Sequence, residues 1–232
     1  MVFVCSARIN FITKLFNLLM IPLPVIAQDV MVFDVAHIRK LRSLGIAGVL
    51  SGTLSAAPQQ NLLLGVPLRL SIFDAIWLVR NHHAFLYDSA AYHQGLTTTN
   101  NSVDPSIDNK NQSNFITIPS TSSAPGPPPI EYQISIDEFM PKDTKTAQLY
   151  KVYSSLRSRG YWVSPGLRFG GDFVAYPGDP LLFHSHLIVS HADEVTNQDL
   201  VHRGRLATGV KKLWCVVDSM EKAYSIEWAG FG

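Results

Sequence analysis

The chain has 232 residues, enough for one or two domains, and 47% of them are apolar, which is enough for a packed core. Only 16% are charged and the formal net charge is +1, so the charge does not indicate a nucleic-acid partner, and any RNA binding needs a local basic patch or a larger assembly. The two cysteines, Cys5 and Cys215, exclude a disulfide framework and a cysteine-based zinc motif, which weakly favours a reducing compartment.

The N-terminal segment permits two interpretations. Two basic residues precede an apolar run that ends near Ala27, as in a secretory signal peptide. Pro22 and Pro24 interrupt this run, which is also too short and too broken to span a membrane. The stretch PVIAQDVMVFD instead predicts two short strands around a turn at Gln28-Asp29, and we prefer this second interpretation.

Residues 20–94 are predicted to form a first α/β domain. After the strand pair, VAHIRKLRSLG has apolar residues at helical spacing and ends at Gly45, where a helix C-terminus is expected. The segment AAPQQNLLLGVPLRL predicts a loop that leads to a short strand. In SIFDAIWLVRNH, Ser71 and Asp74 have the spacing of a capping box and predict the start of a second helix. AFLY predicts the strand that closes the domain.

Residues 95–145 are predicted to be a flexible linker. The runs TTTNNSVDPSIDNKNQSN and PSTSSAPGPPP are rich in Asn, Ser, Thr and Pro, and they contain too few apolar residues to offset the entropy lost on ordering. Within this segment, IEYQISIDEF has enough apolar residues to pack locally.

Residues 146–232 are predicted to form a second α/β domain with one early helix and a mixed or antiparallel sheet. The helix is predicted in AQLYKVYSSLRSRG and ends at Gly160. A short polar helix is predicted in NQDLVHRGRLATG. Strands are predicted in YWV, LRFGGDFVAY, HSHLIVS, VKKLWCVVD and AYSIEWAGF.

The run FGGDFVAYPGDPLLFHSHLIV contains the residues best suited to chemistry. Tyr176-Pro177-Gly178-Asp179 matches a type II turn, with proline at the second position and glycine at the third, where φ must be positive. We therefore expect the chain to reverse directly after Tyr176 and a new strand to begin near His184. The side chains of Tyr176 and His184 can then lie at the same end of the sheet.

A tyrosine, a histidine and a lysine could together cleave RNA without a metal. Attack of a ribose 2′-OH on its own 3′-phosphate needs a base for the 2′-OH proton, an acid for the leaving 5′-oxygen, and a cation beside the developing phosphorane charge. Histidine suits the acid because its unperturbed pKa is about 6.5. Tyrosine has an ordinary pKa of about 10 and needs a nearby cation to act as the base, for which Lys212 is the candidate.

Each of these residues also has an ordinary structural explanation. Tyr176 could pack at a strand end, His184 could simply be hydrogen-bonded, and Lys212 could be solvated. The other chemical alternative is a metal site at His184, His186 and His191, but no matching carboxylate or cysteine set completes it. We therefore expect neither a metal nor a cofactor. Composition and spacing alone indicate only an α/β domain with a possible acid–base site.

Several stretches resemble the tRNA-splicing endonuclease family. YSSLRSRGYWVSPGLRFGGDFVAYPGDPLLFHSHLIV, DLVHRGRLATGVKK and YSIEWAGF resemble its C-terminal catalytic domain. VFDVAHIRKLRSLGIAGVLSGTL and PQQNLLLGVPLRL resemble the N-terminal domain of its 34-type subunit, in a fungal form. The resemblance implies a small N-terminal α/β domain followed by a restriction-endonuclease-like tRNA-intron endonuclease domain with a mixed sheet.

The resemblance implies a catalytic subunit that cuts precursor tRNA at the 3′ splice site and leaves a 2′,3′-cyclic phosphate and a 5′-OH. The family's general base falls on Tyr176, its general acid on His184, and its charge-stabilising lysine on Lys212, with Lys211 as the neighbour. No motif position is lost, so an active subunit is expected. The alternative is a non-catalytic subunit that positions the RNA.

The resemblance also implies a nuclear heterotetramer with a second catalytic subunit and two structural subunits. The RNA surface would then be shared, with Arg203, Arg205 and Lys211 either contacting phosphates or forming a solvated face. The apolar final strand, AYSIEWAGF, invites pairing with a partner chain, which we expect to be the small 15-type structural subunit. Because the family's opening strands fall on PVIAQDVMVFD, cleavage near Ala27 would remove part of the fold, which disfavours secretion.

Overall fold

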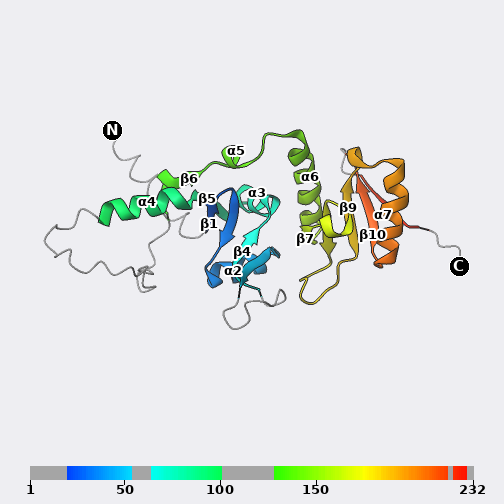
Figure 1. Ribbon diagram of the computed structural model, residues 1–232, viewed down its shortest axis with the longest axis horizontal. Coiled ribbons are helices and arrows are strands. Elements are labelled where there is room, and N and C mark those ends of the chain that lie inside the picture. The colour runs from blue at the N-terminus through cyan, green and yellow to red at the C-terminus, as the bar shows by residue number, and fades with distance from the viewer. Residues whose placement is uncertain (1–19, 54–63, 101–127, 219–221, 229–232) are drawn as a thin grey trace, which may run out of the picture.

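The computed structural model describes residues 20–53, 64–100, 128–218 and 222–228, which form two α/β domains placed side by side along the long axis (Figure 1). Each domain is built on one mixed sheet with helices packed against it. None of the described helices has the length and apolar character needed to cross a membrane.

The first domain contains a six-stranded mixed sheet. Its strands are β1 (Ile21–Ile26), β2 (Asp29–Val32), β3 (Val49–Thr53), β4 (Leu64–Leu70), β5 (Ala84–Asp88) and β6 (Gln133–Ile134). In space their order is β3-β4-β2-β1-β5-β6, with β1 and β5 parallel and the other neighbours antiparallel.

The predicted strand pair at the start of the chain is confirmed as a two-residue hairpin. Ile26 pairs with Asp29, and Ala27 and Gln28 between them have φ values of 48° and 74°. Two consecutive positive φ values give the type I′ turn, whose twist matches that of the flanking strands. Since β1 lies between β2 and β5, cleavage near Ala27 would remove an interior strand of this sheet.

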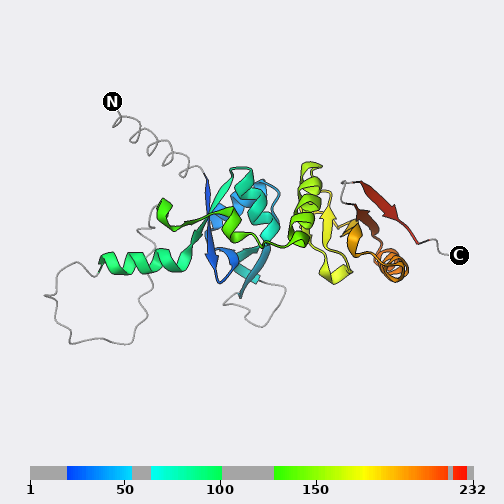
Figure 2. The same cartoon turned by 90° about the horizontal axis from the view of Figure 1, so that it is seen from above.

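The helices of the first domain are α2 (Val35–Ser43), α3 (Ile72–Arg80) and α4 (Ser89–Asn100). The predicted capping box is present: the Ser71 hydroxyl accepts the Asp74 N–H, and the Asp74 carboxylate accepts the Ser71 N–H. The predicted glycine after the earlier helix, Gly45, has a φ of +79°. Figure 2 shows α4 projecting away from the body of the domain.

Part of the predicted linker belongs to the first domain. Within the segment IEYQISIDEF, the chain forms η2 (Ile130–Tyr132), β6 and α5 (Ile136–Phe139). Strand β6 pairs with β5, and Ile134 and Phe139 pack against the hydrophobic core of the first domain. The predicted linker residues 101–127 lie outside the described residues.

The second domain contains a five-stranded sheet between two helices. Its strands are β7 (Trp162–Pro165), β8 (Phe173–Tyr176), β9 (Leu187–His191), β10 (Leu213–Val217) and β11 (Ala223–Ile226), with short η3 (Leu167–Phe169) and η4 (Ala192–Glu194) turns between them. Their order is β11-β10-β9-β8-β7, and only β9 and β10 run parallel. Helix α6 (Thr144–Ser158) packs against one face, and α7 (Asn197–Gly209) packs against the other (Figure 1).

The two domains are in direct contact through α3 and α6. The buried Asp74 carboxylate accepts a hydrogen bond from the Tyr153 hydroxyl, and its burial raises the pKa of Asp74. From α6, Arg157 donates to the carbonyls of Leu44 (2.6 Å) and Gly45 (2.8 Å), which follow α2. The sequence predicted two domains joined by a linker. The structure adds an interface that fixes one against the other, in which these polar contacts accompany apolar packing of α3 against α6 and the second sheet.

Candidate active site

Three strand ends meet at one end of the second sheet. Tyr176 is the last residue of β8, and Ala175 before it pairs with Leu187, the first residue of β9. Leu187 in turn pairs with Leu213, the first residue of β10. Tyr176, the residues just before β9 and the residue just before β10 therefore lie at the same sheet end.

The sequence-predicted residues fall on these strand ends. Tyr176 is half-buried, His184 is exposed in the loop before β9, and Lys212 immediately precedes β10. Neighbouring strands are about 4.8 Å apart, so β8 and β10 are separated by about 10 Å. Side chains as long as tyrosine and lysine can reach a common ligand across that distance.

The chain reversal between Tyr176 and His184 differs from the predicted type II turn. Gly178 does not have a positive φ, so the predicted turn conformation is wrong. The reversal is built around Asp179, whose carboxylate accepts the Leu181 N–H (2.9 Å) and whose carbonyl accepts the N–H groups of Leu182 and Phe183. An aspartate that bonds the backbone two residues ahead nucleates a turn by itself. A Cβ on Gly178 would meet the Phe183 ring at 2.8 Å, so a larger residue there would require the exposed Phe183 side chain to move.

Lys212 is held by Ser185, which the sequence did not single out. The Lys212 ammonium donates to the Ser185 hydroxyl (2.6 Å) and to the Ser185 carbonyl (2.9 Å). Its Nζ also lies 5.0 Å from the centre of the Phe169 ring. Ser185 is buried and lies directly after His184, so the lysine is tied to the loop that carries the histidine.

The end of α7 sets the direction of Lys212. Lys211 adopts a left-handed backbone with a φ of +54°, and its N–H bonds the Thr208 carbonyl. The Lys212 N–H bonds the Ala207 carbonyl at 2.8 Å. These two bonds cap the helix and turn the chain into β10. Lys211 itself is exposed.

The alternative metal site is not assembled. His191 is the last residue of β9 and is buried, whereas His184 and His186 precede the strand. At about 3.3 Å per residue, the backbone of His191 lies about 16 Å from that of His186. Within the described parts of the chain, no three His, Cys, Asp or Glu side chains form a group that could hold a metal ion.

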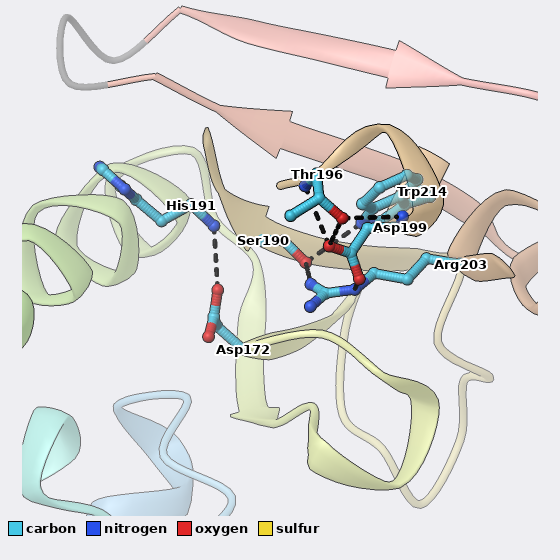
Figure 3. Close-up of polar contacts among 7 residues, drawn as sticks. All are labelled: Asp172, Ser190, His191, Thr196, Asp199, Arg203 and Trp214. Atoms are coloured by element: carbon cyan, nitrogen blue, oxygen red, sulfur yellow. Dashed lines mark hydrogen bonds and ion pairs between the residues drawn. The ribbon is translucent and has the colours of Figure 1, made fainter. Parts of the chain in front are cut away.

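Arg203, one of the predicted phosphate contacts, is engaged inside the domain. Figure 3 shows its guanidinium bonded to the Asp199 carboxylate (3.0 Å) and to the hydroxyl of Ser190 (3.3 Å). The same hydroxyl accepts the indole N–H of Trp214 at 3.1 Å. Asp199 also caps α7 through Thr196, and the bonds from Thr196, with Arg203 nearby, lower the pKa of Asp199. These contacts give Arg203 a structural role, and its contact with RNA stays a prediction.

Arg205 lies against the C-terminal segment. Its guanidinium carbon is 4.7 Å from the centre of the Trp228 ring, two residues beyond β11. Strand β11 is the edge of the second sheet, and three of its four residues are exposed. The described C-terminal residues therefore present an unpaired strand edge with an aromatic and a basic side chain beside it.

A cavity of about 480 Å³ lies between the two domains. It is lined by residues of the first sheet, by Ser71 and Asp74, and by Val163–Pro165 of the second domain. It contains none of Tyr176, His184 and Lys212. The three candidate residues instead lie at the end of the second sheet.

Both domains match known protein families. Residues 21–89 match the family described as TSEN34-like, N-terminal domain. Residues 146–228 match the family described as tRNA intron endonuclease, catalytic C-terminal domain. The second match contains the strand ends described above.

Several known proteins are similar to this chain in sequence. A "tRNA-splicing endonuclease subunit SEN34" of Saccharomyces cerevisiae is 34% identical over 272 aligned residues, covering 87% of this chain and 99% of the yeast protein. A "Probable tRNA-splicing endonuclease subunit sen34" of Schizosaccharomyces pombe is 28% identical over 91% of this chain and 98% of its own length. The human Sen34 subunit is 44% identical over 87 residues, which cover 34% of this chain and 28% of the human protein. The chain therefore belongs to the SEN34 family of tRNA-splicing endonuclease subunits.

Proposed function

We propose that this chain is the subunit that cuts precursor tRNA at the 3′ splice site, with Tyr176, His184 and Lys212 as its catalytic residues. The convergence of the ends of β8, β9 and β10 within the tRNA intron endonuclease domain supports this assignment. Ser185 ties Lys212 to the loop of His184, which supports a shared site for these two residues.

The proposed reaction is an attack by the ribose 2′-OH on the adjacent phosphorus. Tyr176, as the phenolate, takes the 2′-OH proton while the 2′-O–P bond forms; the P–O5′ bond breaks, and His184, as the imidazolium, gives its proton to the leaving 5′-oxygen. The Lys212 ammonium stabilises the additional negative charge on the phosphorane. The products are a 2′,3′-cyclic phosphate on one fragment and a 5′-OH on the other. None of these steps requires a metal ion.

The test is cleavage of an intron-containing precursor tRNA by the reconstituted complex in the presence of excess EDTA. We expect the 3′ cut to keep its rate, and the upstream fragment to carry a phosphate that resists phosphatase until acid opens the cyclic diester. Loss of the cut in EDTA, restored by a divalent cation, would contradict the mechanism. A fragment with a free 3′-OH would contradict it as well.

The names of the yeast and human relatives describe them as subunits, and we propose that this chain also works in a complex, a nuclear heterotetramer with a second catalytic and two structural subunits. The exposed edge of β11 is the proposed contact with the small 15-type subunit, because an unpaired strand can add a partner's strand by main-chain hydrogen bonds.

Deletion of residues 222–232 is expected to abolish co-purification of the small structural subunit, because the pairing edge is removed. Tyr224→Ala is the matched control, since it removes one exposed side chain but leaves the backbone edge intact. Recovery of the partner in wild-type amounts with the deleted chain would contradict the proposed contact.

A further inference from the structure

We propose that Arg42, in the N-terminal domain, is a positioning residue for the active site of the C-terminal domain. Its guanidinium bonds the Asp179 carboxylate, 137 residues away in the sequence. Arg42 lies in the last turn of α2, whereas Asp179 lies in the loop that joins Tyr176 to His184. The inference rests on the proposed catalytic roles of those two residues.

Asp179 organises the whole loop. Its carboxylate accepts the Leu181 N–H, and its carbonyl accepts the Leu182 and Phe183 N–H groups at 2.8 and 2.9 Å. These three bonds fix the loop that connects the proposed base, Tyr176, to the proposed acid, His184. The same carboxylate oxygen that accepts from Leu181 also accepts from Arg42, so the arginine bonds the atom around which the loop turns.

Arg42 also contacts the strand beside Tyr176. Its guanidinium carbon lies 5.6 Å from the centre of the Trp162 ring, and Trp162 pairs with Tyr176 in the β7–β8 register. A guanidinium over an aromatic ring is held electrostatically as well as by packing. Arg42 of the N-terminal domain therefore contacts Trp162, which pairs with Tyr176, and also contacts Asp179 in the loop that follows Tyr176.

The electrostatics agree with a persistent ion pair. The Leu181 N–H and the Arg42 guanidinium together lower the pKa of Asp179, so the carboxylate is charged at neutral pH. The Arg42 side chain is 29% exposed and the Asp179 side chain is 27% exposed. The pair is therefore partly shielded from solvent.

The first measurement is amide hydrogen exchange on the full-length chain in its assembled complex. In Arg42→Ala, we expect the amides of Leu181, Leu182 and Phe183 to exchange about 3- to 10-fold faster, because Asp179, which accepts their hydrogen bonds, is no longer bonded to residue 42. Arg39→Ala is the matched control: Arg39 is an exposed arginine one turn earlier on α2. Exchange in Arg42→Ala equal to that in Arg39→Ala would overturn the proposal.

The second measurement separates the two cuts of precursor tRNA. Arg42→Ala and Asp179→Asn are each expected to lower kcat of the 3′ cut by about 10-fold, with KM and the 5′ cut unchanged, since misplaced groups lower the rate without removing binding. The double variant should be no slower than either single variant, because both break one interaction. Multiplied effects, or equal slowing of both cuts, would overturn the proposal.

Two further variants keep the outcome decisive. If Arg42→Ala does not assemble, Arg42→Lys replaces it, and a smaller increase in exchange at the same three amides supports the proposal while unchanged exchange overturns it. His184→Ala serves as the reference for the proposed function. If it abolishes the 3′ cut while Arg42→Ala leaves both the cut and the exchange unchanged, the positioning role fails and the nuclease assignment stands.

Discussion

Replacing His184 with alanine is expected to slow cleavage at the 3′ splice site by about 10²- to 10⁴-fold, because the leaving 5′-oxygen loses its proton donor. The side chain is exposed at the end of the second sheet, so its removal leaves no cavity in the core. The 5′ cut, made by another subunit in the proposed complex, should keep its rate. The measurement is a time course on a labelled precursor tRNA in which each cut is followed separately.

His186→Ala is the control for that experiment. His186 is also exposed, lies two residues further on, and packs near the Tyr161 ring, so it matches His184 in type and location. We expect its 3′ cut to be close to wild type. Wild-type cleavage by His184→Ala would favour the non-catalytic, RNA-positioning alternative. Loss of the cut in both variants, together with sensitivity to EDTA, would favour a metal site.

Replacing Asp74 with alanine is expected to lower the free energy of unfolding by about 2–4 kcal/mol. The change removes the acceptor of the buried Tyr153 hydroxyl, and a buried donor left unpaired costs about 1–3 kcal/mol. It also removes half of the capping box of α3, at a further cost of about 1 kcal/mol. Urea unfolding of the full chain measures the loss.

Asp34→Ala isolates the capping contribution. Asp34 caps α2 by accepting the Ala36 N–H at 2.7 Å, but it lies at the surface, and its loss should cost about 1 kcal/mol. An Asp74→Ala variant no less stable than Asp34→Ala would show that the Tyr153 contact contributes little.

The same aspartate gives a pH dependence with a defined sign. Because burial raises the pKa of Asp74, the folded chain keeps a proton that the unfolded chain has already released above about pH 4. This group therefore stabilises the fold fully at low pH and loses that contribution as the pH rises through the folded pKa. The stability advantage of wild type over Asp74→Asn should shrink as the pH rises above about 4, and a constant difference would contradict the raised pKa.

Local patterns predicted most of the secondary structure. Helical spacing and the capping box located α3, and glycines with positive φ mark the ends of the predicted helices at Gly45 and Gly160. The polar helix NQDLVHRGRLATG matches α7 residue for residue. These signals are readable because caps, turns and amphipathic spacing depend on residues three or four apart.

The turn after Tyr176 was predicted incorrectly for a related reason. Proline followed by glycine favours a type II turn, but the Asp179 side chain competes by bonding the Leu181 N–H and moves the reversal further along. The Pro177-Gly178 signal and the Asp179 signal overlap in the sequence. The contact of Asp179 with Arg42 joins residues 137 positions apart, which local sequence patterns do not detect. The role of Ser185 was missed because one serine between two histidines has no distinctive spacing.

The sequence by itself predicted the two-domain order, most of the helices and strands, the family, and the three residues proposed for catalysis, but it missed β3, α4 and β6. Only the tertiary structure decided which strand ends meet, that β6 joins the first sheet, and that Ser185 holds Lys212. It also decided that Asp74, Tyr153, Arg157 and Arg42 join the domains. These contacts link residues tens of positions apart, and they form only after the sheets and helices have packed, so no local preference encodes them.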